Sequence, residues 1–149
     1  MDRKLKIYTD GGSRGNPGPS AGGYLLVDAQ TGEKVAEEGV YLGVTTNNQA
    51  EYLALKYALE AALKLGCRDC EVYMDSLLVV NQMRGLFKVK NRDLWPVHES
   101  IVELAKQFKH LSFTHIPREQ NVTADTLVNR CLDSQQAVLD AEQLPQDLA

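Results

Sequence analysis

The chain has 149 residues, a formal net charge of -4 at pH 7, 44% hydrophobic residues and 24% charged residues. A domain of this length buries roughly two thirds of the surface that its unfolded chain exposes, so no second core is required. No apolar run approaches the roughly 18 residues of a membrane span, and no apolar signal-peptide core follows the first charged residues. We therefore expect a cytoplasmic, monomeric protein with no membrane partner.

Alternating apolar and polar residues predict three strands in the first third of the chain. The first strand covers residues 5–9 and runs into a loop at Asp10-Gly11-Gly12. Residues 22–28 and 34–42 then form an antiparallel hairpin.

A long amphipathic helix is predicted next. Apolar residues recur at helical spacing over residues 50–65, and Gly66 ends the helix. Thr46 and Gln49 have the spacing of a capping box, in which the Thr46 hydroxyl accepts a hydrogen bond from the Gln49 backbone N–H. This start places Glu51 early in the helix.

The remaining pattern alternates strands and helices. A short strand at residues 71–75 can lie parallel to the first strand, because a helix connects the two. The later elements are helices at about 76–83 and 93–108, a strand at 111–116 and a helix from 122 to about 137. Residues 137–149 are an acidic, proline-containing tail, which limits the catalytic domain to residues 1–136.

Four acidic residues fall where these elements meet. Asp10 and Asp75 are expected at the carboxyl ends of strands, and in open α/β sheets ligands bind at that edge. Glu51 and Asp125, each early in a helix, can reach the same place. Each acid alone is explained by a turn, a helix cap or the helix dipole.

The combination of these acids is harder to explain without metal. Carboxylates that converge without basic partners repel one another, and divalent Mg²⁺ or Mn²⁺ removes that cost. Two such ions about 4 Å apart stabilise the attacking and leaving oxygens of a phosphoryl displacement. The ions would also offset the negative net charge locally, so that charge does not exclude nucleic acid as a partner.

Five ordered segments carry a family resemblance. They are YTDGGSRGNPGPSAGGY, TTNNQAEYLAL, VYMDSLLVVNQ, GLFKVKN and IPREQNVTAD. With these segments the chain resembles the ribonuclease H type 1 family to about residue 136. The resemblance implies an α/β, ribonuclease H-like fold with a five-stranded mixed sheet, order 3-2-1-4-5, flanked by helices. It also implies endonucleolytic hydrolysis of the RNA strand of RNA/DNA hybrids, leaving 5′-phosphate and 3′-hydroxyl ends.

The resemblance further implies roles for single residues. Asp10 would bridge two Mg²⁺ ions, Glu51 and Asp75 would bind the ion nearer the leaving group, and Asp125 would bind the ion that carries the nucleophilic water. Short amides suit the 2′-hydroxyl of RNA, which both donates and accepts hydrogen bonds. The residues expected to contact the hybrid are Gly11, Gly12, Asn16, Thr46, Asn47, Asn48, Lys88, Lys90 and Asn91.

Three departures from the family pattern mark this chain. The segment between Pro117 and Asp125 is too short for the loop that carries a histidine in many relatives, and His115 is expected inside the last strand. Arg118 is the candidate auxiliary cation in its place. Leu77 stands where relatives commonly have a polar residue.

The third departure is a reduced basic protrusion. Cationic residues with an interleaved aromatic suit phosphate and sugar contacts, although a solvated charged face has the same composition. The residues of this stretch are Arg84, Phe87, Lys88, Lys90 and Arg92, followed by Trp95.

Other functions remain open from the sequence. A nuclease or strand-transferase of the same fold acting on DNA is one alternative, and a non-catalytic hybrid-binding module is another. The cysteines Cys67 and Cys70 form a C-x-x-C, but with Cys131 the number of cysteines is odd and no second pair exists for zinc. We interpret them as structural thiols rather than a redox pair.

Overall fold

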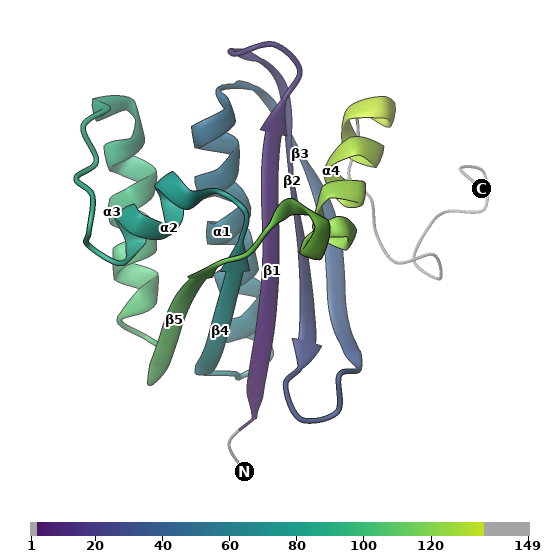
Figure 1. Cartoon of the computed structure of the whole chain (residues 1–149), viewed down its shortest axis with the longest axis vertical. Coiled ribbons are helices and arrows are strands. Elements are labelled where there is room, and N and C mark those ends of the chain that lie inside the picture. The colour runs from purple at the N-terminus through teal and green to yellow at the C-terminus, as the bar shows by residue number, and fades with distance from the viewer. Residues whose placement is uncertain (1–2, 136–149) are drawn as a thin grey trace.

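Strand β1 (Lys4–Ser13) is the centre of a five-stranded sheet in the computed structural model, which describes residues 3–135 (Figure 1). β1 pairs antiparallel with β2 and parallel with β4, and the sheet order is β3-β2-β1-β4-β5. This confirms the predicted mixed sheet. The other strands are β2 (Gly18–Asp28), β3 (Lys34–Thr45), β4 (Asp69–Met74) and β5 (His110–His115).

Helices cover both faces of the sheet (Figure 1). α1 (Asn47–Lys64) and α3 (Trp95–Ala105) bury the main apolar core against one face, and α4 (Val122–Ser134) lies on the other. The shorter α2 (Leu77–Met83) follows β4. No helix within residues 3–135 is long and apolar enough to cross a membrane.

The ends of α1 follow from local chemistry. The Thr46 hydroxyl accepts from the Gln49 N–H at 3.2 Å, and the Gln49 side chain accepts from the Thr46 N–H at 3.1 Å, so the predicted capping box is confirmed. At the other end Gly66 has a φ of 76°, and the backbone N–H of Cys67 donates to Ala62. This is the left-handed termination that favours glycine.

β1 is longer than its sequence pattern predicts. The expected loop at Asp10-Gly11-Gly12 is wrong: the strand continues to Ser13, and Gly11 pairs with Gly22 of β2. Glycine inside a strand often marks a close backbone approach, and here both β1 glycines face helices. The turn into β2 lies at residues 14–17 instead.

Other boundaries shift by a few residues. The region predicted as one helix over 93–108 begins as a 3₁₀ turn, η1 (Arg92–Leu94), because Pro96 lacks the N–H that an earlier start would use. α4 ends at Ser134, with Gln135 in a left-handed conformation. The predicted tail at 137–149 and the domain boundary at residue 136 lie outside the described residues and stay predictions.

Candidate active site

Three of the four predicted acids form one group. Ligand oxygens of Asp10, Glu51 and Asp75 all lie within 4.8 Å of one another. Asp75 directly follows β4, whereas Asp10 lies inside β1 rather than at its end. It is the first β1 residue beyond the last β1–β4 pair, which joins Thr9 and Met74. The two carboxylates therefore meet where these strands separate.

Glu51 reaches this point because α1 lies directly against the β1 backbone. A Cβ added at Gly11 would lie 2.3 Å from the carbonyl carbon of Ala50. The Gly11 N–H also donates a hydrogen bond to the Glu51 carboxylate. Gly11 is buried and sets the distance between strand and helix, and its expected contact with substrate stays a prediction.

Asp125 comes from the opposite face of the sheet. It lies in the first turn of α4, and its carboxyl group contacts that of Asp10, although it is not part of the group of three. α4 can approach the sheet closely because Gly23 has no side chain. A Cβ at this position would lie 2.6 Å from the Ala124 carbonyl oxygen. Asp10 is thus the member of the group of three that also contacts Asp125.

The acid cluster has no cationic partner within residues 3–135. Glu51 is 8% exposed, and its Oε2 is buried without a hydrogen-bond partner. A buried carboxylate oxygen without a partner carries a large desolvation cost. A divalent cation, which prefers carboxylate oxygens, satisfies that oxygen and offsets the mutual repulsion, so the residues fit a metal ion.

Burial and repulsion also change proton binding. Burial, then the charge of Asp75 and the neighbouring Asp125, raises the pKa of Asp10 to about 7. Burial together with Asp10 and Asp75 raises the pKa of Glu51 well above its usual value. Without metal, Asp10 and Glu51 of the folded protein therefore keep their protons at pH values at which the same carboxyl groups of the unfolded chain have lost them.

These pKa shifts predict that the metal-free protein loses stability as pH rises. Between about pH 4 and 7 the folded state binds more protons than the unfolded state, so the free energy of unfolding falls with pH. The Asp10 shift alone corresponds to at most about 4 kcal/mol. Urea unfolding in EDTA across this range measures the slope, and the Asp10→Asn variant should have a shallower one. A free energy of unfolding that rises over the range would contradict the prediction.

A cavity of about 360 Å³ opens beside the acids. Arg118, exposed in the 3₁₀ turn η2 (Arg118–Gln120), lines it and makes no ion pair within the described chain. The predicted residues that line this cavity are Asp10, Gly11, Gly12, Asn47, Asn48, Glu51, Arg118 and Asp125.

Asn16 and Thr46 do not line this cavity but support its wall. The Asn16 Oδ1 accepts from the Asn47 N–H at 3.1 Å, and the Asn47 Oδ1 accepts from the Ser13 N–H at 2.8 Å. Thr46 is engaged in the helix cap. Among residues 3–135 the side-chain nitrogens of Asn16 and Asn47 donate no hydrogen bond, so these donors remain available to a ligand.

The basic stretch lines an adjoining cavity of about 490 Å³. Its lining includes Lys88, Lys90 and Asn91, and Asn48 belongs to both cavities. Both lysines are exposed, and the Trp95 indole N–H holds the segment by donating to the Val89 carbonyl at 2.8 Å. The structure therefore places the basic stretch next to the acid site, with Asn48 between them.

Some residues of the site were not expected from the sequence. Arg14 and Asn129 line the cavity, and the Asn129 side chain lies 3.4 Å from an Asp125 oxygen. Asn121 precedes α4 but makes no side-chain cap; its amide contacts Asp75 instead. In the sequence Asn121 stands four residues before Asp125, at the expected start of a helix. That position alone indicates a helix cap and gives no sign of a contact with Asp75.

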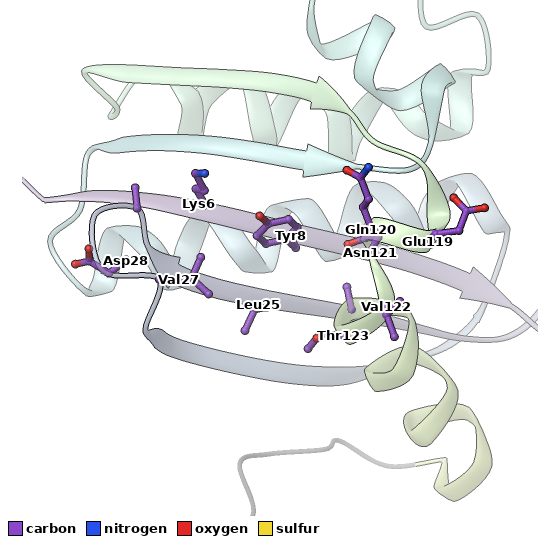
Figure 2. A pocket seen from close by; sticks show the side chains of 13 residues that line it. Lys6, Tyr8, Leu25, Val27, Asp28, Glu119, Gln120, Asn121, Val122 and Thr123 are labelled. Atoms are coloured by element: carbon purple, nitrogen blue, oxygen red, sulfur yellow. The ribbon is translucent and has the colours of Figure 1, made fainter.

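A separate cavity of about 430 Å³ lies where the start of α4 crosses the sheet (Figure 2). Lys6 and Tyr8 of β1 and Leu25 and Val27 of β2 form its floor, as Figure 2 shows. None of the four acids lines it, so it is distinct from the candidate active site.

His115 lies in the last strand, as predicted. It is the last residue of β5 and pairs with Met74.

The two cysteines of the C-x-x-C lie in the interior. Cys67 and Cys70 are buried, with their sulfurs 3.7 Å apart, and burial raises the pKa of the Cys70 thiol. A reactive thiolate is therefore disfavoured, in agreement with structural cysteines.

Comparison with known proteins identifies the family. A family model described as reverse transcriptase-like matches residues 8–131. RNase H1 from the halophilic archaeon Halobacterium salinarum is 46% identical, with a TM-score of 0.85 over 88% of this chain and 98% of that one. LC11-RNase H1, solved in complex with an RNA/DNA hybrid, is 43% identical, with a TM-score of 0.83 over 88% and 98%. The chain belongs to the type 1 ribonuclease H family.

Some curated relatives extend well beyond this chain. The bifunctional protein Rv2228c of Mycobacterium tuberculosis is 43% identical over 93% of this chain, which spans 39% of that protein. Its N-terminal RNase H domain, solved as a fusion, has a TM-score of 0.86 over 89% of this chain and 96% of that one. The similarity therefore concerns the nuclease domain of that relative.

Proposed function

We propose that this chain hydrolyses the RNA strand of RNA/DNA hybrids endonucleolytically, using two Mg²⁺ ions and leaving 5′-phosphate and 3′-hydroxyl ends. The observation that carries the proposal is the group of Asp10, Glu51 and Asp75, whose ligand oxygens converge within 4.8 Å without a cationic partner in the described chain. The hybrid bound to LC11-RNase H1 supports the choice of substrate. Mn²⁺ suits the same oxygen ligands.

The roles of the acids follow from their contacts. Asp10 would hold both ions, because it touches the group of three and Asp125. Glu51 and Asp75 would hold the ion nearer the leaving oxygen, and Asp125 the other. When bound, such ions lower the pKa of a coordinated water and offset negative charge on the reacting phosphate.

Substrate recognition would involve the residues around the first turn of α1. Asn16, Asn47 and Asn48 can donate to and accept from the 2′-hydroxyl groups that distinguish RNA from DNA. Arg118, which lines the same cavity, would add a cation opposite a phosphate. Gly12 lines the cavity and Thr46 supports its wall, so both would shape the surface that receives the RNA strand. Asn91 would contact the hybrid together with Lys88 and Lys90, with which it lines the adjoining cavity.

Removing the cations of the basic stretch should weaken hybrid binding without slowing the chemistry. The double variant Lys88→Ala/Lys90→Ala is expected to raise KM about tenfold at 0.1 M salt, because each lost phosphate contact weakens binding and reduces its salt dependence. The kcat should stay unchanged. A variant with the same charge change elsewhere, Lys64→Ala/Lys106→Ala, is the control. Equal effects in both variants would argue that net charge, rather than this surface, binds the substrate.

A cleavage assay on labelled substrates tests the proposed function. The wild-type chain should cut the RNA strand of a hybrid in Mg²⁺ or Mn²⁺ and leave duplex DNA intact, and Asp75→Asn should be inactive. Cleavage of duplex DNA would favour a DNA nuclease of the same fold instead. Binding of hybrid without cleavage in either metal would indicate a non-catalytic binding module.

The cytoplasmic location and the monomeric state stay predictions. Size-exclusion chromatography with light scattering checks the second of these directly.

A further inference from the structure

Asn121 occupies an unusual position between the sheet and α4. It is 1% exposed, although it precedes a surface helix, and its side chain does not cap that helix. Its amide nitrogen donates to the Thr9 carbonyl at 2.8 Å and to Oδ2 of Asp75 at 3.2 Å. Both partners are acceptors, so only this orientation of the amide fits.

The backbone of Asn121 makes a third connection. Its carbonyl accepts a hydrogen bond from the N–H of Asp125 at 3.2 Å, within the first turn of α4. One residue thus contacts Asp75 directly, the Asp125 backbone, and Thr9, the neighbour of Asp10 in β1. It connects Asp75, at the end of β4, with Asp125, which comes from the face of the sheet that α4 covers.

The arrangement has a cost that helix anchoring alone does not explain. The Asn121 Oδ1 is buried and has no hydrogen-bond partner among the described residues. An apolar residue would remove this unsatisfied oxygen, but it would also take away the donor to the Thr9 carbonyl and to Asp75. What the amide supplies is a donor to a carboxylate oxygen, which fixes the orientation of Asp75 and leaves its other oxygen available to a cation.

We propose that Asn121 is a positioning residue for the metal site, which orients Asp75 and holds α4 at the distance that brings Asp125 to Asp10. This inference rests on the proposed metal-dependent function. Asn121 also lines the cavity of Figure 2, which none of the four acids lines. Hydrogen-bond partners of metal ligands commonly contribute 10- to 100-fold to metal affinity.

Calorimetric titration with Mg²⁺ tests the proposal without relying on turnover. Asn121→Leu, which keeps side-chain volume but removes the donor, should weaken the Mg²⁺ Kd by at least about tenfold. With saturating hybrid its kcat should fall and recover as Mg²⁺ is raised, while KM for the hybrid stays unchanged. A lower Tm with an unchanged Mg²⁺ Kd would overturn the proposal and leave Asn121 as a packing residue.

Gln82→Leu is the matched control. Gln82 is also a buried amide that donates to a backbone carbonyl, that of Lys88 at 3.2 Å, but it contacts none of the acids. It should lower Tm and leave the Mg²⁺ Kd within about twofold, because no metal ligand moves. A comparable loss of Mg²⁺ affinity in this control would show that general destabilisation, not Asn121, sets the Kd, and would overturn the proposal.

A measurement on the wild-type chain covers the case in which Asn121→Leu does not fold. In ¹⁵N-correlated spectra the side-chain amide signal of Asn121 should shift with Mg²⁺ at the Kd found by calorimetry, and that of Gln82 should not. An Asn121 signal that ignores Mg²⁺ overturns the proposal. Cleavage of hybrid by the wild-type chain is scored separately, so failure of the proposed function is distinguishable from failure of this inference.

Discussion

Asp10→Asn is expected to reduce kcat for hybrid cleavage at least about a thousandfold. Asp10 is the acid that touches both Asp125 and the group of three, so its loss affects both proposed metal positions. A thousandfold change corresponds to about 4 kcal/mol of transition-state stabilisation, within the several kcal/mol that metal catalysis supplies. Single-turnover cleavage of a labelled hybrid in Mg²⁺ measures it.

The same substitution should stabilise the metal-free protein. At pH 8 the wild-type Asp10 is charged and buried beside other carboxylates, whereas asparagine carries no charge. The free energy of unfolding in EDTA should therefore rise by about 2 kcal/mol. Asp69→Asn, which removes an equal charge at the start of β4, should cleave at the wild-type rate. Wild-type cleavage by Asp10→Asn would refute the assigned site.

Gly11→Ala should damage both stability and activity. The added Cβ would lie 2.3 to 2.5 Å from backbone atoms of Ala50 and Glu51, which cannot rotate away as a side chain could. α1 must move off β1, at a cost of about 3 kcal/mol of unfolding free energy. A displacement of Glu51 by about 1 Å would lower kcat about a hundredfold. Urea unfolding and cleavage at saturating hybrid measure the two effects.

Gly12→Ala is the control for this prediction. A Cβ at Gly12 would lie 3.6 Å from Val128 Cγ1, an ordinary contact, so the free energy of unfolding should change by less than about 1 kcal/mol. If the Gly11 variant unfolds at the same urea concentration as the Gly12 variant, close packing of β1 on α1 is not what places Glu51.

The sequence predicted the order of elements but not all their ends. Periodicity identifies strands and helices, and the Thr46 cap and Gly66 locate the ends of α1, because the bonds at these ends form between neighbours in sequence. The continuation of β1 through Gly11 was missed because it depends on a partner, Gly22, eleven residues away. The local sequence shows that a glycine allows many backbone conformations, but it does not show which strand or helix packs against that glycine.

The residues of the candidate site also fall into those that the sequence could predict and those that it could not. The acids could be predicted because each stands in a recognisable motif, and three of them converge as expected. Asn121 could not, because its role depends on two long-range hydrogen bonds, to Thr9 and Asp75, while its sequence position indicates a cap. Arg14 was missed for a related reason: it reaches the cavity through the β1–β2 turn and pairs with Asp133 of α4.

The glycines on the two central strands have a consequence for how metal affinity can change. Gly11 and Gly22 face α1, and Gly23 faces α4. At these positions no side chain of the sheet separates its backbone from the two helices. Glu51 and Asp125 arrive from opposite sides of the sheet. The spacing of the cation ligands is therefore set partly by uncharged glycines beside Asp10. Gly22→Ala, which adds a methyl group facing α1, should change metal affinity while all four carboxylates are kept.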